Sequence, residues 1–375
     1  MPRMAYNPHT SVEVDLSALE RNYRLIRKAL APSTQIVAVV KADAYGHGAV
    51  PVARRLQEVG AAMLGVANVA EGVELREGGV KIPILLLGGF QPGEEREVLA
   101  YNLSPMLYRW DGMESLASEA SRDGKRVKVH LKVDTGMGRL GVPWKEAPQF
   151  MERLRQLPSL VVEGVASHLA TADEDPEYAR EQLQRLLWVV REVSKGQSKP
   201  LLHIANSAAV FTLPEAHLDL VRPGIALYGA HPSASFKALH PLPLEPVMTW
   251  KSKIADLKEH PPSSSISYGR TFVTSVPSRI AAVPVGYADG YPRCLSNKAQ
   301  VLVRGRRAPV VGRVTMDWIM VDVTSIPDAE VGDEVILLGG GEGGISAEEL
   351  SSWAETIPYE ILCSAGMRSK RLYKG

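Results

Sequence analysis

Eight short apolar segments that alternate with helical patterns are the feature that most limits how this chain can fold. The segments cover residues 36–41, 61–67, 82–88, 103–107, 127–133, 161–168, 201–206 and 218–220. Strands buried on both faces appear as continuous apolar runs, and helical crossovers between them make the strands parallel. Eight such units in about 200 residues are typical of an α/β fold, the (β/α)8 TIM-type barrel. A doubly wound sheet stays open as an alternative, because a sequence does not show whether a sheet closes.

The pattern changes after Leu242, where Pro241, Pro243 and Pro246 form a hinge-like stretch. Short strands with turn signals follow at 247–258, 279–285, 300–303, 308–314, 319–323 and 334–338. One helix is predicted at 346–356, where Ser346 and Glu349 have the spacing of a capping box. The sequence therefore predicts two domains, a barrel over 14–242 and a mostly β domain over 243–375, with residues 1–13 expected to pack on the second.

Composition excludes several classes of protein. The formal net charge is +1, so bulk electrostatics favours neither nucleic acid nor a membrane surface as a partner. The two cysteines, Cys294 and Cys363, lack the spacing of a zinc site and indicate a reducing compartment. No apolar run has the length of a membrane span, and residues 1–10 lack the apolar core of a signal peptide. We therefore expect a soluble cytoplasmic protein without a metal.

The carboxyl ends of the predicted strands carry most of the chemistry. In a barrel these ends meet at one face, where active sites lie. They supply Lys41 and Tyr45, Arg139, His168, Asn206 and Ser207, and Arg222. Lysine, arginine and histidine gathered with few carboxylates favour an anionic ligand. A lysine withdrawn from water also becomes a nucleophile toward carbonyls, although such a residue by itself more often only marks a strand end.

Phosphate and a reactive lysine together point to one cofactor. Gly224 and Ile225 offer backbone amides just past a strand, and Ser207 opens a helix, so these positions suit a phosphate group. A lysine that forms a Schiff base beside a phosphate site suggests pyridoxal 5'-phosphate. Each residue alone has an ordinary structural explanation: Ser207 is a plain helix cap and His168 a hydrogen-bonded barrel residue. Their coincidence at strand ends is what favours the cofactor.

Several motifs resemble those of the alanine racemase family, in the same order and over nearly the whole chain. They are VVKADAYGHGA (39–49), VDTGMGRLG (133–141), SHLATAD (167–173), HIANSAA (203–209), RPGIALYG (222–229), SYGRTF (267–272), GYADGYPR (286–293) and GRVTMD (312–317). The first and fifth are highly specific. The resemblance implies a pyridoxal-phosphate enzyme with an N-terminal barrel, a C-terminal β domain and a head-to-tail homodimer whose active sites are shared.

The resemblance also implies a role for each matching residue. Lys41 would bind the cofactor covalently and act as one catalytic base, and Tyr268 of the partner subunit would be the other. The remaining cofactor-binding residues would be Tyr45, His168, Asn206, Ser207, Arg222 (at the pyridine nitrogen), Gly224 and Ile225. Arg139, Met316 and Tyr287 would bind the substrate, and Asp173, Arg293 and Arg313 would line its approach path. Lys132 matches a lysine that is carbamylated in some members.

The activity implied is the interconversion of L-alanine and D-alanine by two bases, supplying D-alanine for peptidoglycan. A broad-specificity or serine racemase stays open, because Met367 and Trp318 depart from the family's usual residues. An amino-acid decarboxylase of the same fold is disfavoured, since an acidic residue in place of Arg222 would suit that chemistry. A non-catalytic cofactor-binding protein is disfavoured because it would leave the domain that carries Tyr268 without a use.

Overall fold

The computed structural model describes residues 6–194, 199–341 and 343–375, and its contacts divide the chain into two compact units. One unit comprises the described residues within 23–44 and 49–227. The other comprises those within 6–22, 45–48 and 228–375. The predicted domain bounds, 14–242 and 243–375, stay a prediction, since units defined by contacts need not coincide with domains of the fold.

The first unit is the predicted barrel. Its parallel strands are β2 (Gln35–Val39), β3 (Met63–Val66), β4 (Ile84–Leu86), β5 (Ser104–Leu107), β6 (Val127–Asp134), β8 (Leu160–Ala166), β9 (Leu201–His203) and β10 (Leu220–Val221). Neighbours follow the order β5-β4-β3-β2-β10-β9-β8-β6, and β5 also pairs with β6. This last pairing closes the sheet, so the barrel prediction is confirmed and the open sheet is wrong. The two-residue strand β7 (Val142–Pro143) pairs with the end of β6.

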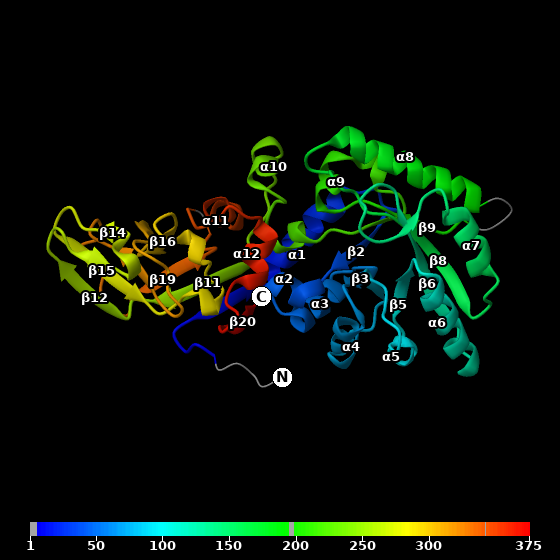
Figure 1. Ribbon diagram of the computed structural model, residues 1–375, viewed down its shortest axis with the longest axis horizontal. Helices are drawn as coiled ribbons and strands as arrows, with labels where there is room; N and C mark the ends of the chain where they lie inside the picture. Colours follow the sequence, from blue (N-terminus) through cyan, green and yellow to red (C-terminus); the bar gives the residue numbers. More distant parts are fainter. Residues whose placement is uncertain (1–5, 195–198, 342) are drawn as a thin grey trace. The chain divides into compact units, whose positions relative to one another are not determined.

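Helices surround these strands (Figure 1). They are α3 (Ala49–Glu58), α4 (Val69–Glu77), α5 (Glu95–Ala100), α6 (Trp110–Arg122), α7 (Ala147–Arg155), α8 (Pro176–Val193) and α9 (Ser207–Thr212), with 3-10 turns η1 (Pro214–Ala216) and η2 (Ile225–Tyr228). The helix starts follow from local chemistry. Asp175 accepts hydrogen bonds from the first amides of α8, and Asn68 does the same for α4. An apolar cluster fills part of the interior: Val37, Met63, Leu85, Met106, Ala166 and Leu220.

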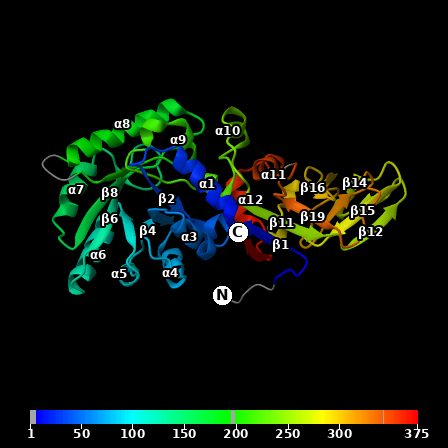
Figure 2. The same ribbon diagram turned by 180° about the vertical axis from the view of Figure 1, so that it is seen from behind.

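The second unit is mostly β, as predicted. Its six-stranded sheet has the order β17-β16-β19-β11-β1-β20, and a three-stranded sheet has the order β12-β15-β18. The strands are β1 (Ser11–Asp15), β11 (Met248–Lys253), β12 (Asp256–His260), β13 (Ser265–Ile266), β14 (Phe272–Val273), β15 (Ser278–Val283), β16 (Gln300–Val303), β17 (Arg306–Pro309), β18 (Ile319–Asp322), β19 (Glu334–Leu338) and β20 (Lys370–Lys374). Figure 2 shows these strands from behind.

Short helices complete the second unit. They are α10 (Ala234–Leu239), α11 (Ala347–Ala354) and α12 (Pro358–Ser364), with 3-10 turns η3 (Tyr268–Arg270), η4 (Tyr287–Asp289) and η5 (Arg293–Leu295). Ser346 caps α11 as predicted, because its hydroxyl accepts the amide hydrogen of Glu349. The carboxylate of Glu349 bonds to Arg307. The chain passes from this unit to the barrel through α1 (Leu16–Lys28).

Two predicted strands are wrong in detail. The segment 247–258 is two strands, because the chain leaves one sheet for another between them. The amide of Ile254 donates to Asp333 and the next amide, that of Ala255, donates to Ala282. The strand predicted at 308–314 is β17, which ends at Pro309. Strand β20 was not predicted because its residues are mostly polar, yet it pairs in parallel with β1.

Candidate active site

Lys41 begins a turn with the wrong hand for ordinary residues. It lies two residues after the end of β2, and α2 (Lys41–Gly46) holds φ angles of 54°, 53°, 53° and 53° from Ala42 to Tyr45. Left-handed helical backbone costs roughly 1–2 kcal/mol per residue for amino acids with a β-carbon. Strain of this kind persists only where the surroundings fix it, and it gathers at functional sites. The strained backbone therefore indicates a functional site at Lys41, independently of the chemistry of the lysine side chain.

Glu71 of α4 holds the start of this turn. One carboxylate oxygen accepts the amide hydrogen of Ala42 at 2.8 Å, and the other accepts that of Ala67 at 2.6 Å. The carboxylate of Asp43 in turn accepts the amide hydrogen of Ala49 at 2.7 Å. Two acidic side chains therefore bind backbone amides at the start of the turn and just beyond its end. Glu71 was not predicted, because its only signal in the sequence is that of an acidic residue near the start of a helix.

The predicted cations of the barrel unit share one region. The His168 ring faces Arg222, Lys132, Arg139 and Lys41, and burial together with these charges holds its pKa well below the usual range. Burial, with the charges of Arg222 and Arg139, also lowers the pKa of Lys132 to about 7. The structure therefore brings together residues that the sequence placed on four separate strands or loops.

Arg222 is almost completely buried, and its guanidinium has no carboxylate among its described partners. It donates to Nδ1 of His203 at 2.7 Å, to Nδ1 of His168 at 3.2 Å, and to the carbonyl oxygens of Ser167 and Ile204. Burial lowers its pKa to about 10, so it stays charged near neutral pH. A cation held by neutral groups leaves its charge available to a ligand.

The loop that carries Arg139 is built on Asp134. The carboxylate of Asp134 accepts amide hydrogens from Gly136, Met137 and Gly138. These bonds fold the loop tightly after β6 and leave the Arg139 side chain exposed. An exposed arginine at the mouth of a barrel can meet an anionic substrate group.

Ser207 is placed to bind an anion. Its buried hydroxyl oxygen accepts amide hydrogens from Gly224 at 2.9 Å and from Ala226 at 3.3 Å. Because these bonds occupy the lone pairs, the hydroxyl proton is left for another acceptor. Asn206 caps α9 by accepting the amide hydrogen of Ala209. With the nearby cations, this donor set fits a phosphorylated cofactor such as pyridoxal phosphate.

Tyr45 belongs by its contacts to the second unit. Its ring stacks on Tyr228 with centroids 4.8 Å apart and lies 6.0 Å from the ring of Tyr359. Burial raises the pKa of its hydroxyl far above the usual value. A hydroxyl that stays protonated can donate to phosphate, as the predicted role of Tyr45 requires.

The remaining predicted residues of the second unit lie on loops that are bonded to one another. Ser267 donates to the carbonyl of Arg313 at 2.7 Å, and the Arg313 guanidinium lies beside Gly269. The amide of Tyr287 donates to the carbonyl of Thr315. Side chains on these loops are unusually exposed for their type: Tyr268 72%, Met316 54%, Tyr287 43% and Trp318 43%. Single apolar residues at a surface are ordinary, but a bonded group of them indicates an interaction site.

Arg368 ties this group together and was not predicted. It donates to both carboxylate oxygens of Asp289 at 2.9 Å and to Asp317 at 2.7 Å. Asp289 also accepts the amide hydrogen of Gly286 at the start of η4. These bonds fix the backbone between Tyr287 and Met316. Asp173 is partly buried in the barrel unit, and Arg293 is exposed on η5.

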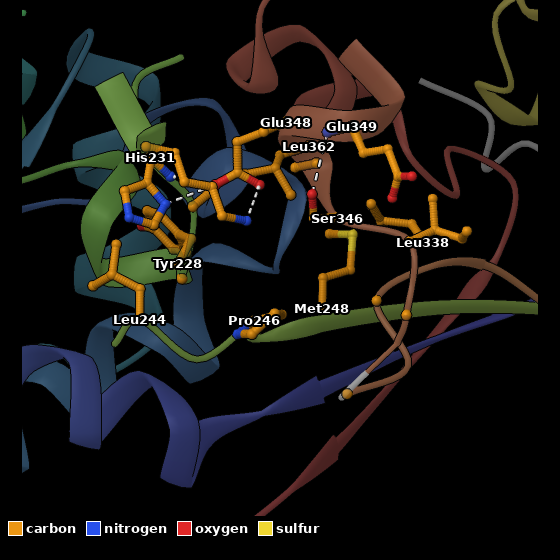
Figure 3. A pocket seen from close by; sticks show the side chains of 18 of the residues that line it. Tyr228, His231, Leu244, Pro246, Met248, Leu338, Ser346, Glu348, Glu349 and Leu362 are labelled. Carbon is orange, nitrogen blue, oxygen red and sulfur yellow. Dashed lines mark hydrogen bonds and ion pairs between the residues drawn. The ribbon is translucent and has the colours of Figure 1, made fainter. Parts of the chain in front are cut away.

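The second unit also contains a cavity of about 360 Å³, and none of the predicted active-site residues lines it (Figure 3). Within it, Glu348 accepts both the amide and the ring Nδ1 hydrogen of His231, at 2.9 and 2.8 Å. The other ring nitrogen of His231 accepts the amide hydrogen of Leu242. Every polar group of this buried pair is thus satisfied within the chain, and the pair holds residues 231–242 against α11.

Comparisons with known proteins agree with this geometry. Family models described as "Alanine racemase, N-terminal domain" and "Alanine racemase, C-terminal domain" match residues 14–232 and 247–373. The alanine racemase of Geobacter sulfurreducens is 48% identical over 371 residues, 97% of each chain.

Solved structures extend the similarity. That of alanine racemase from Streptomyces lavendulae is 38% identical, with a TM-score of 0.93 and 98% of each chain covered. That of alanine racemase from Bartonella henselae, with covalently bound pyridoxal phosphate, is 33% identical, with a TM-score of 0.88, 98% of this chain and 100% of that chain covered. Across the described residues, every helix is too short or too polar to span a bilayer. The chain belongs to the alanine racemase family.

Proposed function

We propose that this protein interconverts L-alanine and D-alanine with pyridoxal phosphate bound to Lys41. The observation that carries the proposal is the strained turn that presents Lys41 toward the His168 ring, which Arg222, Lys132 and Arg139 also face. Full-length relatives named alanine racemase support it. When bound, the cofactor acidifies the bond between the substrate's α-carbon and its hydrogen. The chain's own residues must then hold the cofactor and the substrate and move the proton.

Cofactor binding is assigned to the residues that the family's motifs predict for it. Ser207 donates its hydroxyl proton to the phosphate, helped by Tyr45 and by the backbone at Gly224 and Ile225. Arg222 faces the pyridine nitrogen, with His168 and Asn206 beside it. Because Arg222 stays positively charged there, it disfavours a second positive charge on that nitrogen. This limits side reactions that need a strongly electron-withdrawing ring.

Substrate binding is assigned to Arg139, Tyr287 and the backbone of Met316. The guanidinium of Arg139 pairs with the substrate carboxylate. The backbone of Met316, which hydrogen bonds fix in place, makes a second contact with the substrate. Arg313, Arg293 and Asp173 line the approach path. Met367 and Trp318, both exposed, depart from the family's usual residues, so we propose that the enzyme also accepts amino acids other than alanine.

Two bases act on opposite faces of the α-carbon, so the substrate keeps one orientation throughout the reaction. Lys41 takes or returns the proton on one face, and Tyr268 of the partner subunit does so on the other. Tyr268 is 72% exposed in a single chain, which supports a homodimer that covers it. We place this activity in the cytoplasm, where its product D-alanine supplies peptidoglycan synthesis.

Lys132 is assigned as a carbamate. Its lowered pKa, about 7, leaves a large fraction of neutral amine near neutral pH. A neutral amine adds to carbon dioxide, forming a nitrogen–carbon bond and releasing one proton. The product is an anion, which suits the buried space between Arg222 and Arg139 better than a third cation. Labelled ¹³C-bicarbonate should give a carbamate signal that is absent in Lys132→Ala.

The first experiment is the visible absorbance of the purified protein, followed by circular dichroism during incubation with D-alanine and then L-alanine. We expect an absorbance band from lysine-bound cofactor that Lys41→Ala lacks, and loss of optical activity from either enantiomer. A band without loss of optical activity would contradict racemisation. Absence of a band after incubation with pyridoxal phosphate would contradict the role of Lys41.

The two-base assignment has its own test in deuterated water. Tyr268→Phe should still exchange the α-hydrogen of one alanine enantiomer but should not produce the other enantiomer. Tyr101→Phe is the matched control, because it removes a surface hydroxyl bonded to Glu77. Racemisation at the wild-type rate by Tyr268→Phe would show that Tyr268 is not a base.

A further inference from the structure

Two fully buried histidines lie in the barrel interior, beyond the residues to which the proposed function gives a role. His130 is on β6 and His203 ends β9, and both are 0% exposed. Nδ1 of His130 lies 2.8 Å from Nε2 of His203, and the rings meet edge to face with centroids 5.0 Å apart. Branched apolar side chains usually fill barrel interiors, so buried imidazoles need a specific reason.

The protons on both rings follow from the partner at one end. The guanidinium of Arg222 can only donate, so Nδ1 of His203 must accept its hydrogen bond. Burial and the charge of Arg222 lower the pKa of His203 well below the usual range, so the ring is neutral and its proton is on Nε2. That proton is donated to Nδ1 of His130. Because burial also lowers the pKa of His130, its single proton is on Nε2.

The chain of hydrogen bonds ends on a carboxylate. Nε2 of His130 lies 3.3 Å from one oxygen of Glu163, and the other oxygen of Glu163 lies 2.5 Å from Nζ of Lys128. The Lys128 side chain is 60% exposed, so this end reaches the surface. Every bond therefore points one way, from Arg222 through two neutral rings to Glu163.

The backbone of β8 is shaped to make this contact. Val129 pairs with Val162 and His130 pairs with Gly164, so Glu163 is the extra residue of a β-bulge. Bulges re-aim side chains and are rare between parallel strands. At Gly164 a β-carbon would lie 2.3 Å from Nδ1 of His130, so only glycine allows the ring to sit there. Two independent backbone features thus serve the same hydrogen-bond chain.

We propose that Glu163, His130 and His203 are positioning residues for Arg222. The one-way chain fixes the orientation of the guanidinium, and the carboxylate of Glu163 fixes the far end of the chain. This inference rests on the proposed function, in which Arg222 faces the pyridine nitrogen of the cofactor.

The chain does not conduct protons. A proton moving through the two rings would have to come from the guanidinium or be accepted by it. Arg222 has no lone pair to accept one and stays charged near neutral pH, with a pKa of about 10. A chain closed at one end by a permanent donor can only lock the two ring tautomers.

The direct test is ¹⁵N NMR of the wild-type holoenzyme with labelled histidine, because protonated and bare ring nitrogens differ widely in chemical shift. We expect His130 and His203 each to carry one proton, on Nε2, throughout the range around neutral pH. A proton on Nδ1 of either ring, or two protons on either ring, would overturn the proposal.

The functional test compares Glu163→Leu and Glu163→Gln with Glu114→Gln, the matched control. Glu114 is an exposed carboxylate of the same barrel that pairs with Arg153. We expect Glu163→Leu to lower kcat on the order of tenfold and to leave KM for alanine unchanged. Loss of a residue that orients a functional side chain typically has an effect of this size. Glu163→Gln keeps an acceptor oxygen, so it should retain the wild-type tautomers and lose less of kcat.

Arg222→Lys separates this inference from the proposed function. If Glu163→Leu leaves kcat unchanged while Arg222→Lys lowers it, Arg222 works in the site but needs no positioning from Glu163, and the inference is wrong. If both variants leave kcat and the visible absorbance of the cofactor unchanged, the assigned place of Arg222 is wrong as well. The NMR measurement needs no variant, so a variant that fails to fold does not prevent the test.

Discussion

Replacing Glu71 by alanine should loosen the turn that presents Lys41. Four consecutive residues hold left-handed backbone there, which costs roughly 4–8 kcal/mol in total. Glu71 opposes that strain directly, because it accepts the amide hydrogen at the first left-handed residue, Ala42. It also bonds the amide of Ala67, which joins the turn to the end of the neighbouring strand β3.

The expected loss of local stability follows from the two hydrogen bonds that Glu71→Ala removes. Hydrogen bonds to charged groups contribute about 1.5–3 kcal/mol each. The bond to Ala42 is exposed, so water replaces part of it, and we expect a local loss of roughly 2–4 kcal/mol. Because about 1.4 kcal/mol corresponds to a tenfold change in an equilibrium, the turn should open roughly 30- to 1000-fold more often.

Hydrogen–deuterium exchange is the suitable assay, because the expected loss of stability is local to one turn. We expect faster exchange in peptides that contain Ala42 and Ala67, and weaker retention of pyridoxal phosphate. Glu71→Gln should fall between wild type and Glu71→Ala, because an amide side chain offers one acceptor oxygen in place of two. Glu77→Ala, which removes an exposed carboxylate at the far end of the same helix, is the matched control and should leave both readouts unchanged.

The reasoning fails if Glu71→Ala exchanges and binds cofactor like the wild type. In that case the left-handed turn would be held by its other bonds alone, such as the one between Asp43 and Ala49. Faster exchange without any change in cofactor retention would refute only the link between the turn and the placement of Lys41.

Three further outcomes follow from the structure. Ser207→Ala leaves two buried amides without their acceptor, at about 1–3 kcal/mol each, so cofactor should be lost faster on dialysis. The pKa of Lys132 in the folded protein is about 7, below the ordinary value of 10.5. In carbon-dioxide-free buffer, the urea midpoint of the wild type should therefore rise with pH between these two values, relative to the midpoint of Lys132→Met. Burial raises the pKa of Glu348, but hydrogen bonds from the side chain and backbone of His231 outweigh it and lower that pKa to about 2. Glu348→Gln should therefore destabilise by roughly 3 kcal/mol near neutral pH, and urea midpoints should converge with the wild type between about pH 4.5 and 2.

The barrel could be predicted because its signals are local. Apolar runs and helical spacing located all eight strands, and strand ends located Lys41, His168 and Arg222 before any contact was known. The second unit was predicted less well for the same reason. The break between β11 and β12 depends on two sheets that compete for consecutive amides, and β20 is stabilised by its pairing with β1.

The parts of the site that the sequence did not reveal depend on pairing between distant segments. Glu163 reads as a polar residue in a strand, and only the register with β6 shows that it is bulged toward His130. Arg368 reads as a charge near the end of the chain, and only the fold brings Asp289 and Asp317 to it. The sign of φ at Ala42 has no sequence signal at all, since neither alanine nor tyrosine favours that backbone.

These unpredicted features share a physical property: each is unfavourable by itself. A left-handed turn, a bulge between parallel strands and two imidazoles inside a barrel all cost stability, and none makes the core larger. Selection for folding alone would replace them with right-handed backbone, regular pairing and branched apolar residues. Their presence around Lys41 and Arg222 is therefore evidence of function that does not depend on resemblance to any relative. It also explains why local rules fail there, because those rules describe what stabilises a chain and these residues do something else.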